Sequence, residues 1–257
     1  DDISFASGLT LSGDFNLGTG SGGGDISFFG SIDGANALTL ETGTGDATFT
    51  GTVNGLTGLT VDTVGTLTTV SSVAVAGDIS LTINDIELGS TLDAGTDDVS
   101  ITGQSGRSMS VGADTSSDIQ IDNTELFNIT AGSLTLKTAN KNITVAGLET
   151  IDLSNIDAKT GLTLDTGSGA GDISFVSKDS DLGVSLTASS GAGKFISSAG
   201  VSTGTDIITG FGNQLSITAS DFTIGSKLDS GSGSTTLSVF GTDRNLDLAG
   251  GDQADGA

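Results

Sequence analysis

The 257-residue chain contains no cysteine, histidine, proline, tryptophan or tyrosine. Without histidine and cysteine it lacks the usual base of a nucleophilic triad and the preferred ligands of zinc, copper and haem iron. A pair of carboxylates can hydrolyse a glycan, but phenylalanine is the only aromatic residue available to hold a sugar. No apolar run reaches the length of a membrane-spanning helix. These absences predict a chain with no enzymatic activity, no catalytic residue, no bound cofactor and no membrane insertion.

Basic residues are also scarce, because 8 lysines and arginines face 32 acidic residues and leave a net charge of −24. Nucleic-acid binding requires clustered lysine and arginine side chains, so nucleic acid is excluded as a partner. An acidic surface is compatible with solubility outside the cell and with divalent cations as counter-ions. Hydrophobic residues make up 35% of the chain, which is enough for a thin core. A thin core suits an elongated repeat protein, in which each layer buries only a few aliphatic side chains.

Short segments that alternate aliphatic residues with serine or threonine recur along the whole chain. Each places its aliphatic groups on one face, as a half-buried strand does, and clusters of Gly, Ser, Asp and Asn separate the segments. The pattern predicts strands at residues 38–40, 48–50, 59–61, 79–83, 99–101, 134–136, 162–164, 215–217 and 246–248. It predicts almost no α-helix, and it predicts the following inward-pointing side chains: Ile26, Phe28, Leu40, Phe49, Leu81, Ile101, Leu136, Leu164, Ile173 and Phe175.

The chain also repeats itself. Residues 19–28 return as residues 166–175, and residues 88–95 return as residues 224–231. Repeats too thin to bury their own hydrophobic face must stack on their neighbours. We therefore predict one all-β parallel β-helix (β-solenoid) over residues 1–257, with related halves of about 1–147 and 148–257. The alternative is two tandem β-sandwich domains, which the missing tryptophan, tyrosine and hairpin turns disfavour.

Two segments resemble a known family of proteins. They are residues 38–46, Leu-Thr-Leu-Glu-Thr-Gly-Thr-Gly-Asp, and residues 162–169, Leu-Thr-Leu-Asp-Thr-Gly-Ser-Gly. They resemble the passenger regions of filamentous-haemagglutinin-like and autotransporter adhesins, which are bacterial surface proteins built from β-strand repeats. The resemblance implies a right-handed coil, export to the cell surface, and a role in adhesion or in a surface fibre. It carries over no catalytic residue.

Several aspartates directly follow a glycine and start a predicted strand, among them Asp25, Asp46 and Asp172. One interpretation is that the carboxylate caps the turn by accepting backbone N–H bonds. The other is a calcium site, to which the doublet Asp97–Asp98 could also contribute. The calcium-binding nonapeptide consensus is not matched in full, because Ser21 and Ser27 replace its second glycine and its apolar residue. The cap is the favoured interpretation.

The first residues, Asp1, Asp2, Ile3, Ser4 and Phe5, match a motif that lies inside a repeat at residues 25–28. Unpaired strand edges add further strands, and proline and clustered lysine, which block such pairing, are missing here. We therefore predict end-to-end self-association through residues 1–5. The predicted function is that of an extracellular structural or adhesive rod, fibre or matrix component. The alternatives are a module that binds a glycan or a surface protein and, less favoured, a carbohydrate-active β-helix enzyme.

Overall fold

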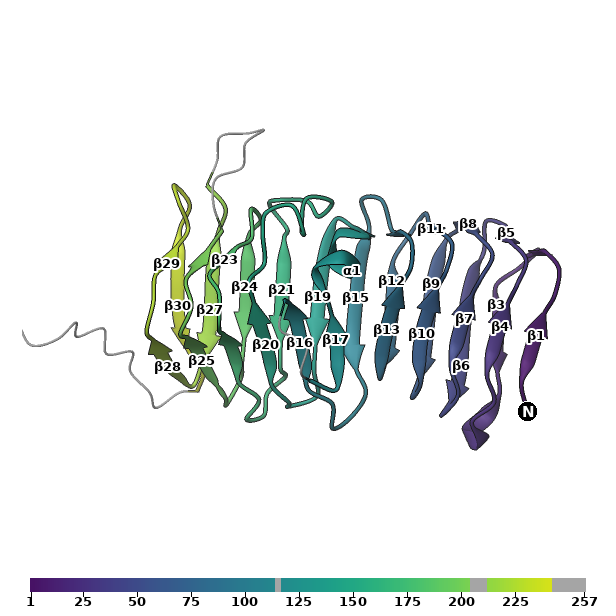
Figure 1. Cartoon of the computed structure of the whole chain (residues 1–257), viewed down its shortest axis with the longest axis horizontal. Coiled ribbons are helices and arrows are strands. Elements are labelled where there is room, and N and C mark those ends of the chain that lie inside the picture. Colours follow the sequence, from purple (N-terminus) through teal and green to yellow (C-terminus); the bar gives the residue numbers. More distant parts are fainter. Residues whose placement is uncertain (114–116, 204–211, 242–257) are drawn as a thin grey trace, which may run out of the picture.

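The computed structural model describes residues 1–113, 117–203 and 212–241. They form an elongated rod, in which short strands lie side by side along the longest axis (Figure 1). The chain runs through three faces in turn, here called A, B and C, and each circuit forms one coil. No helix among the described residues is long and apolar enough to cross a membrane.

Face A is built from two sheets that meet where β13 contacts β17. The first sheet contains β1 (Ile3–Phe5), β4 (Ile26–Phe28), β7 (Ala47–Phe49), β10 (Thr66–Thr69) and β13 (Asp85–Leu88). The second contains, in spatial order, β17 (Ile119–Ile121), β16 (Met109–Gly112), β20 (Ile143–Ala146), β22 (Ile173–Phe175), β25 (Lys194–Ser197) and β28 (Asp221–Ile224).

Face B has the shortest strands and is interrupted. Its first sheet contains β2 (Leu9–Thr10), β5 (Ile32–Asp33), β8 (Val53–Leu56), β11 (Val73–Val75), β14 (Leu92–Asp93) and β18 (Ile129–Thr130). Its second contains β23 (Ser180–Asp181), β26 (Val201–Ser202) and β29 (Leu228–Asp229). Between the two sheets the chain forms turns, with a single bridge from Ala131 to Ile156.

Face C is one continuous ten-stranded sheet. It contains β3 (Phe15–Gly18), β6 (Ala37–Gly43), β9 (Gly58–Thr63), β12 (Ile79–Ile83), β15 (Asp98–Gly103), β19 (Ser133–Lys137), β21 (Leu162–Asp165), β24 (Leu186–Ser189), β27 (Leu215–Ala219) and β30 (Thr235–Val239).

The strand pairs of the described residues are all parallel. A β-sandwich joins consecutive antiparallel strands, so the alternative of two sandwich domains is wrong and the parallel β-helix is confirmed. The two copies of residues 19–28 both supply a strand to face A, β4 and β22. The division into halves at residue 147 stays a prediction.

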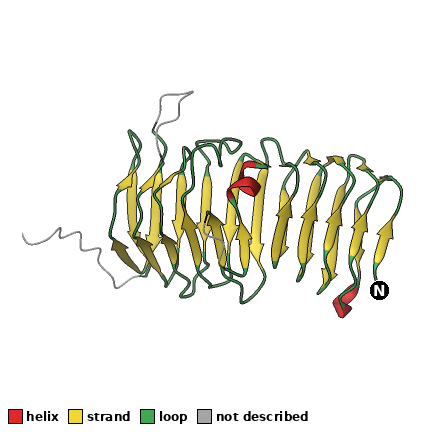
Figure 2. Ribbon diagram, in the orientation of Figure 1, coloured by secondary structure: helices red, strands yellow, loops and turns green. Residues whose placement is uncertain are grey.

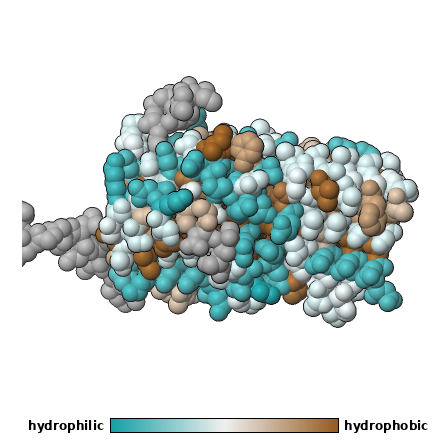
Figure 3. All heavy atoms as spheres, viewed as in Figure 1, coloured by the Kyte–Doolittle hydropathy of each residue, from teal (hydrophilic) through white to brown (hydrophobic). Residues whose placement is uncertain are grey.

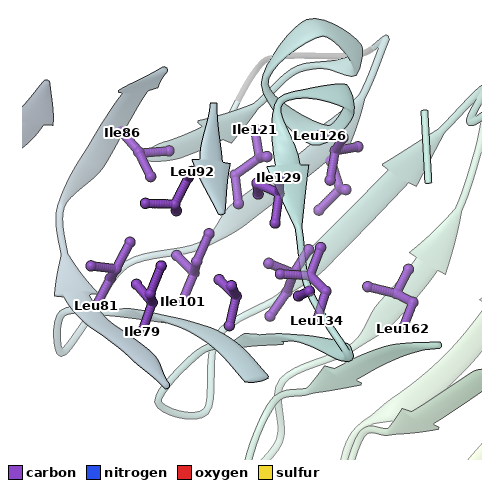
Figure 4. Packing of buried hydrophobic residues seen from close by; sticks show 14 of the residues in the cluster. Ile79, Leu81, Ile86, Leu92, Ile101, Ile121, Leu126, Ile129, Leu134 and Leu162 are labelled. Carbon is purple, nitrogen blue, oxygen red and sulfur yellow. The ribbon is translucent and has the colours of Figure 1, made fainter. Parts of the chain in front are cut away.

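The core runs along the inside of the three faces. The ten side chains predicted to point inward are all buried, with at most 1% of their surface exposed. Figure 4 shows aliphatic side chains from several coils pointing toward one another in this interior. Three rings stack across consecutive coils, with centroids 5.0 Å apart for Phe5 and Phe28 and 5.5 Å for Phe28 and Phe49. Alternation therefore identified the core correctly, because inward side chains occupy every second position.

Helix is rare, as predicted. Figure 2 shows one short 3-10 helix, Gly20–Gly22, and one α-helix, α1 (Asn123–Phe127). Helix α1 lies where the coils lose their regular order, because β16 and β17 occupy adjacent positions on face A while β15 pairs directly with β19 on face C. Face A thus has one more strand than face C. Although β17 follows β16 in the sequence, it lies nearer the amino-terminal end of the rod, between β13 and β16. The predicted strand at residues 246–248 lies outside the described residues.

Candidate functional site

Asp25, Asp46 and Asp172, which each follow a glycine, lie in a column at the corner where the coil enters face A. Asp2 accepts the N–H of Asp25 at 3.0 Å, and Asp25 accepts the N–H of Asp46 at 2.8 Å. Asp46 in turn accepts the N–H of Thr66 at 2.7 Å. Each carboxylate therefore satisfies a backbone donor of the next coil, at a turn where the ladder of strand hydrogen bonds has not yet begun.

The same column continues along the second half of the rod. Asn142 accepts the N–H of Asp172 at 2.9 Å, and Asp172 accepts the N–H of Lys194 at 2.8 Å. Asp118 accepts the N–H of Ser108 at 3.0 Å, and this bond lowers the pKa of the Asp118 carboxyl below its usual value. The acceptor always lies on the side of the column nearer the amino-terminal end of the rod. The geometry thus gives Asp25, Asp46 and Asp172 the role of a cap.

The doublet Asp97–Asp98 lies at a different corner, where the coil enters face C. Asp98 accepts a hydrogen bond from the Ser133 hydroxyl at 2.7 Å, and its own N–H bonds to Asp78 at 3.1 Å. Within the described residues, no three acidic side chains come together in a group that could hold a metal ion. Calcium usually takes 6–8 oxygen ligands. Calcium binding at these aspartates stays a prediction, and water or neighbouring chains would have to complete the shell.

The predicted assembly segment, residues 1–5, contains the end strand of face A. Strand β1 pairs only with β4 among the described residues. Ile3 and Phe5 are half-buried and pack against the core, whereas Asp1, Asp2 and Ser4 are exposed. The N–H of Ile3 bonds to Asp25 and the carbonyl of Phe5 accepts from Phe29. Because backbone groups alternate in direction along a strand, the N–H and C=O of Ser4 point to the unpaired side.

A groove with a volume of about 570 Å³ opens on face B, beside the interruption in that face. Its floor is formed by β23, β26 and β29, which lie near one end of the rod in Figure 1. Asp181, Ser202 and Asp229 are register partners on these strands. One wall is the turn segment of residues 148–151. That wall is held against β23, because the N–H of Asp181 bonds to the carbonyl of Leu148 at 2.8 Å.

The groove is predominantly acidic. Glu149, Asp179, Asp181 and Asp229 line it, and Lys227 is its one basic lining residue. Lys227 forms an ion pair with Asp229 at 2.5 Å, and the hydrogen bond in this pair lowers the pKa of the Asp229 carboxyl. Asp179 accepts the N–H of Gly200 at 2.6 Å. The groove thus offers carboxylate oxygens beside a rigid sheet, without a histidine, a cysteine or an activated nucleophile.

A buried acid lies away from this groove, at helix α1. The Glu125 side chain is 8% exposed and accepts the N–H groups of Leu88 at 3.1 Å and Asp122 at 3.0 Å. Burial raises its pKa to about 7. Asp122 caps the same helix by accepting the Glu125 N–H. The spacing from Asp122 to Glu125 is that of a capping box, so a search for that motif could have located this helix from the sequence.

The groove was not predicted from the sequence. The signal that could have indicated it is the loss of strand alternation across residues 147–161, where face B lacks a regular strand. Its acidic residues come from segments that are distant in the chain, so their convergence depends on the register of the coils. On the face that Figure 3 shows, most of the surface is hydrophilic or of intermediate hydropathy, and hydrophobic residues form small patches.

The fold defines the chain as a parallel β-helix protein. No protein-family model, curated protein or solved structure matches the chain. The resemblance to filamentous-haemagglutinin-like and autotransporter adhesins therefore stays a prediction.

Proposed function

We propose that this chain is a structural and adhesive element of an extracellular or cell-surface assembly, as in β-strand-repeat adhesins. The observation that carries this proposal is the continuous ten-stranded sheet of face C, with a buried aliphatic core along its length. Such an architecture provides a stiff rod, because each coil is bonded to its neighbours through parallel ladders on several faces. We assign no catalytic residue and no cofactor.

We further propose that rods join end to end at the edges of β1, β2 and β3. Each of these strands is the last strand of its sheet at one end of the described structure. Their half-buried side chains Phe5, Leu9 and Phe15 pack against the core from one direction only. Pairing with another coil would supply backbone partners for the outward N–H groups and would cover these apolar groups. The surrounding carboxylates oppose contact, so ionic strength should promote it.

Proline substitution tests this assembly. Ser4→Pro and Asn16→Pro together remove outward N–H donors from β1 and β3 while leaving the bonds to β4 and β6 intact, and Ser4→Ala with Asn16→Ala is the matched control. We expect electron microscopy and light scattering to show salt-promoted filaments for the wild-type chain and the alanine variant, and single rods for the proline variant. A wild-type chain that stays monomeric at high concentration and high salt contradicts end-to-end assembly. Filaments from the proline variant show that assembly uses another surface.

A second candidate function, the binding of a glycan or a partner protein, is favoured by the face B groove. Its volume falls within the range of ligand sites, and its floor belongs to strands of the rod. Screening the purified chain against a glycan array and a peptide library tests this function. Binding that is unaffected by substitutions in the groove would contradict it.

A further inference from the structure

We propose that the face B groove binds an extended peptide segment rich in lysine or arginine from a partner protein. This inference rests on the second function proposed above, and it is independent of filament assembly. Four features carry it: the hollow itself, the imbalance of charge inside it, the carboxylates that lack a partner there, and an exposed isoleucine at its rim.

The charge imbalance sets the sign of the partner. Four carboxylates line the groove against the single ammonium of Lys227, which is already paired with Asp229. Glu149 and Asp181 are exposed, and neither side chain makes a hydrogen bond or ion pair within the part of the chain that the structure describes. An anionic peptide would face these charges without compensation, whereas a cationic peptide would neutralise them.

The arrangement of the carboxylates favours an extended partner. Asp181 and Asp229 occupy the same register position on β23 and β29, with β26 between them. Two inter-strand spacings separate them by roughly 10 Å. Glu149 lies in the turn segment that flanks β23 on the side away from β26, so the acidic groups extend along the groove instead of converging on one point. An extended chain with basic side chains can contact such a row at successive positions, whereas one small ion cannot.

Ile151 supplies the apolar part of the contact. Its side chain is 57% exposed and lies in the turn segment that walls the groove. Lysine and arginine bury their aliphatic stems against apolar surface while the charged end reaches a carboxylate. The combination of an exposed isoleucine and neighbouring carboxylates therefore matches these two residue types.

Fluorescence anisotropy with a labelled peptide of alternating lysine and threonine tests the proposal. The groove variant carries both Glu149→Gln and Asp181→Asn. The control variant carries both Glu41→Gln and Asp62→Asn, which remove the same charge from exposed register partners on face C. We expect the groove variant to bind roughly tenfold more weakly and the control to bind as the wild type does. Ile151→Ser should weaken binding severalfold, and a peptide with glutamate in place of lysine should not bind. Circular dichroism confirms that each variant is folded.

Four results would overturn the inference. Equal weakening by the control variant would show that the peptide follows net charge and not the groove. An unchanged affinity of the groove variant would place the peptide elsewhere. A neutral glycan whose binding is lost in the groove variant, with no peptide binding, would overturn the basic-peptide assignment while leaving the binding function standing. Failure of both ligands at the groove would remove the binding function itself.

Discussion

Glu125 should make the stability of the rod depend on pH near neutrality. Its carboxyl has a folded-state pKa of about 7 against an ordinary value of 4.5, because burial disfavours the charged form. Between these values the folded state binds the proton more tightly than the unfolded state does. The free energy of unfolding therefore falls as the pH rises through this window, and the contribution of Glu125 is lost above pH 7. The shift corresponds to about 3 kcal/mol.

Glu125→Gln removes this titration. The amide oxygen can still accept the N–H of Leu88, but the bond from the Asp122 N–H is lost, which costs about 1 kcal/mol. We expect the variant to be nearly as stable as the wild type at pH 5, because pH 5 lies above the ordinary value of 4.5 and roughly 0.8 kcal/mol of the Glu125 contribution is already lost there. At pH 8 we expect the variant to be about 2 kcal/mol more stable. Many other carboxylates titrate as well, so the informative quantity is the difference between the two proteins at each pH.

Urea unfolding followed by circular dichroism at intervals between pH 5 and pH 8 measures this difference. The control is Glu41→Gln, which removes one negative charge from an exposed position on face C. A stability difference between Glu125→Gln and wild type that grows from near zero at pH 5 to about 2 kcal/mol at pH 8 supports the reasoning. Curves that stay parallel across the whole range would refute it, because they would mean that Glu125 titrates alike in the folded and unfolded states.

Three further outcomes are expected. Phe28→Ala should destabilise the chain by about 4 kcal/mol in urea unfolding, because Phe28 is buried and stacks between Phe5 and Phe49. The control is Phe29→Ala at the exposed neighbouring position, which should change stability by less than about 0.5 kcal/mol. Asp25→Ala should cost about 1 kcal/mol through the unsatisfied N–H of Asp46, and Asp25→Asn should cost clearly less. Calcium should raise the melting temperature at low salt more than sodium chloride of equal ionic strength; identical melting curves would leave the aspartates as caps alone.

The fold class and the core followed from local pattern. Of the nine predicted strands, seven belong to face C, where strands reach up to seven residues and alternation is easily seen. Face B was not predicted strand by strand, because strands such as β2 and β14 contain two residues and carry no period. The cap interpretation of the corner aspartates rests on local turn chemistry. The bonds that their carboxylates accept come from the next coil, 20 to 22 residues further along the chain, and a local pattern does not show them.

The sequence by itself determined that this chain is an all-β repeat protein with a thin aliphatic core, because alternation and glycine-rich turns can be seen locally. Parallel pairing, which excludes the sandwich alternative, was decided by the tertiary structure. Only the tertiary structure decided which residues meet across coils. Three features depend on the length of particular coils. They are the position of β17 beside β16, the hydrogen bond from the Leu88 N–H to the buried Glu125, and the convergence of Glu149, Asp181 and Asp229 on one groove. Coil length varies along the rod, and it decides which distant segments become neighbours only once the coils are stacked.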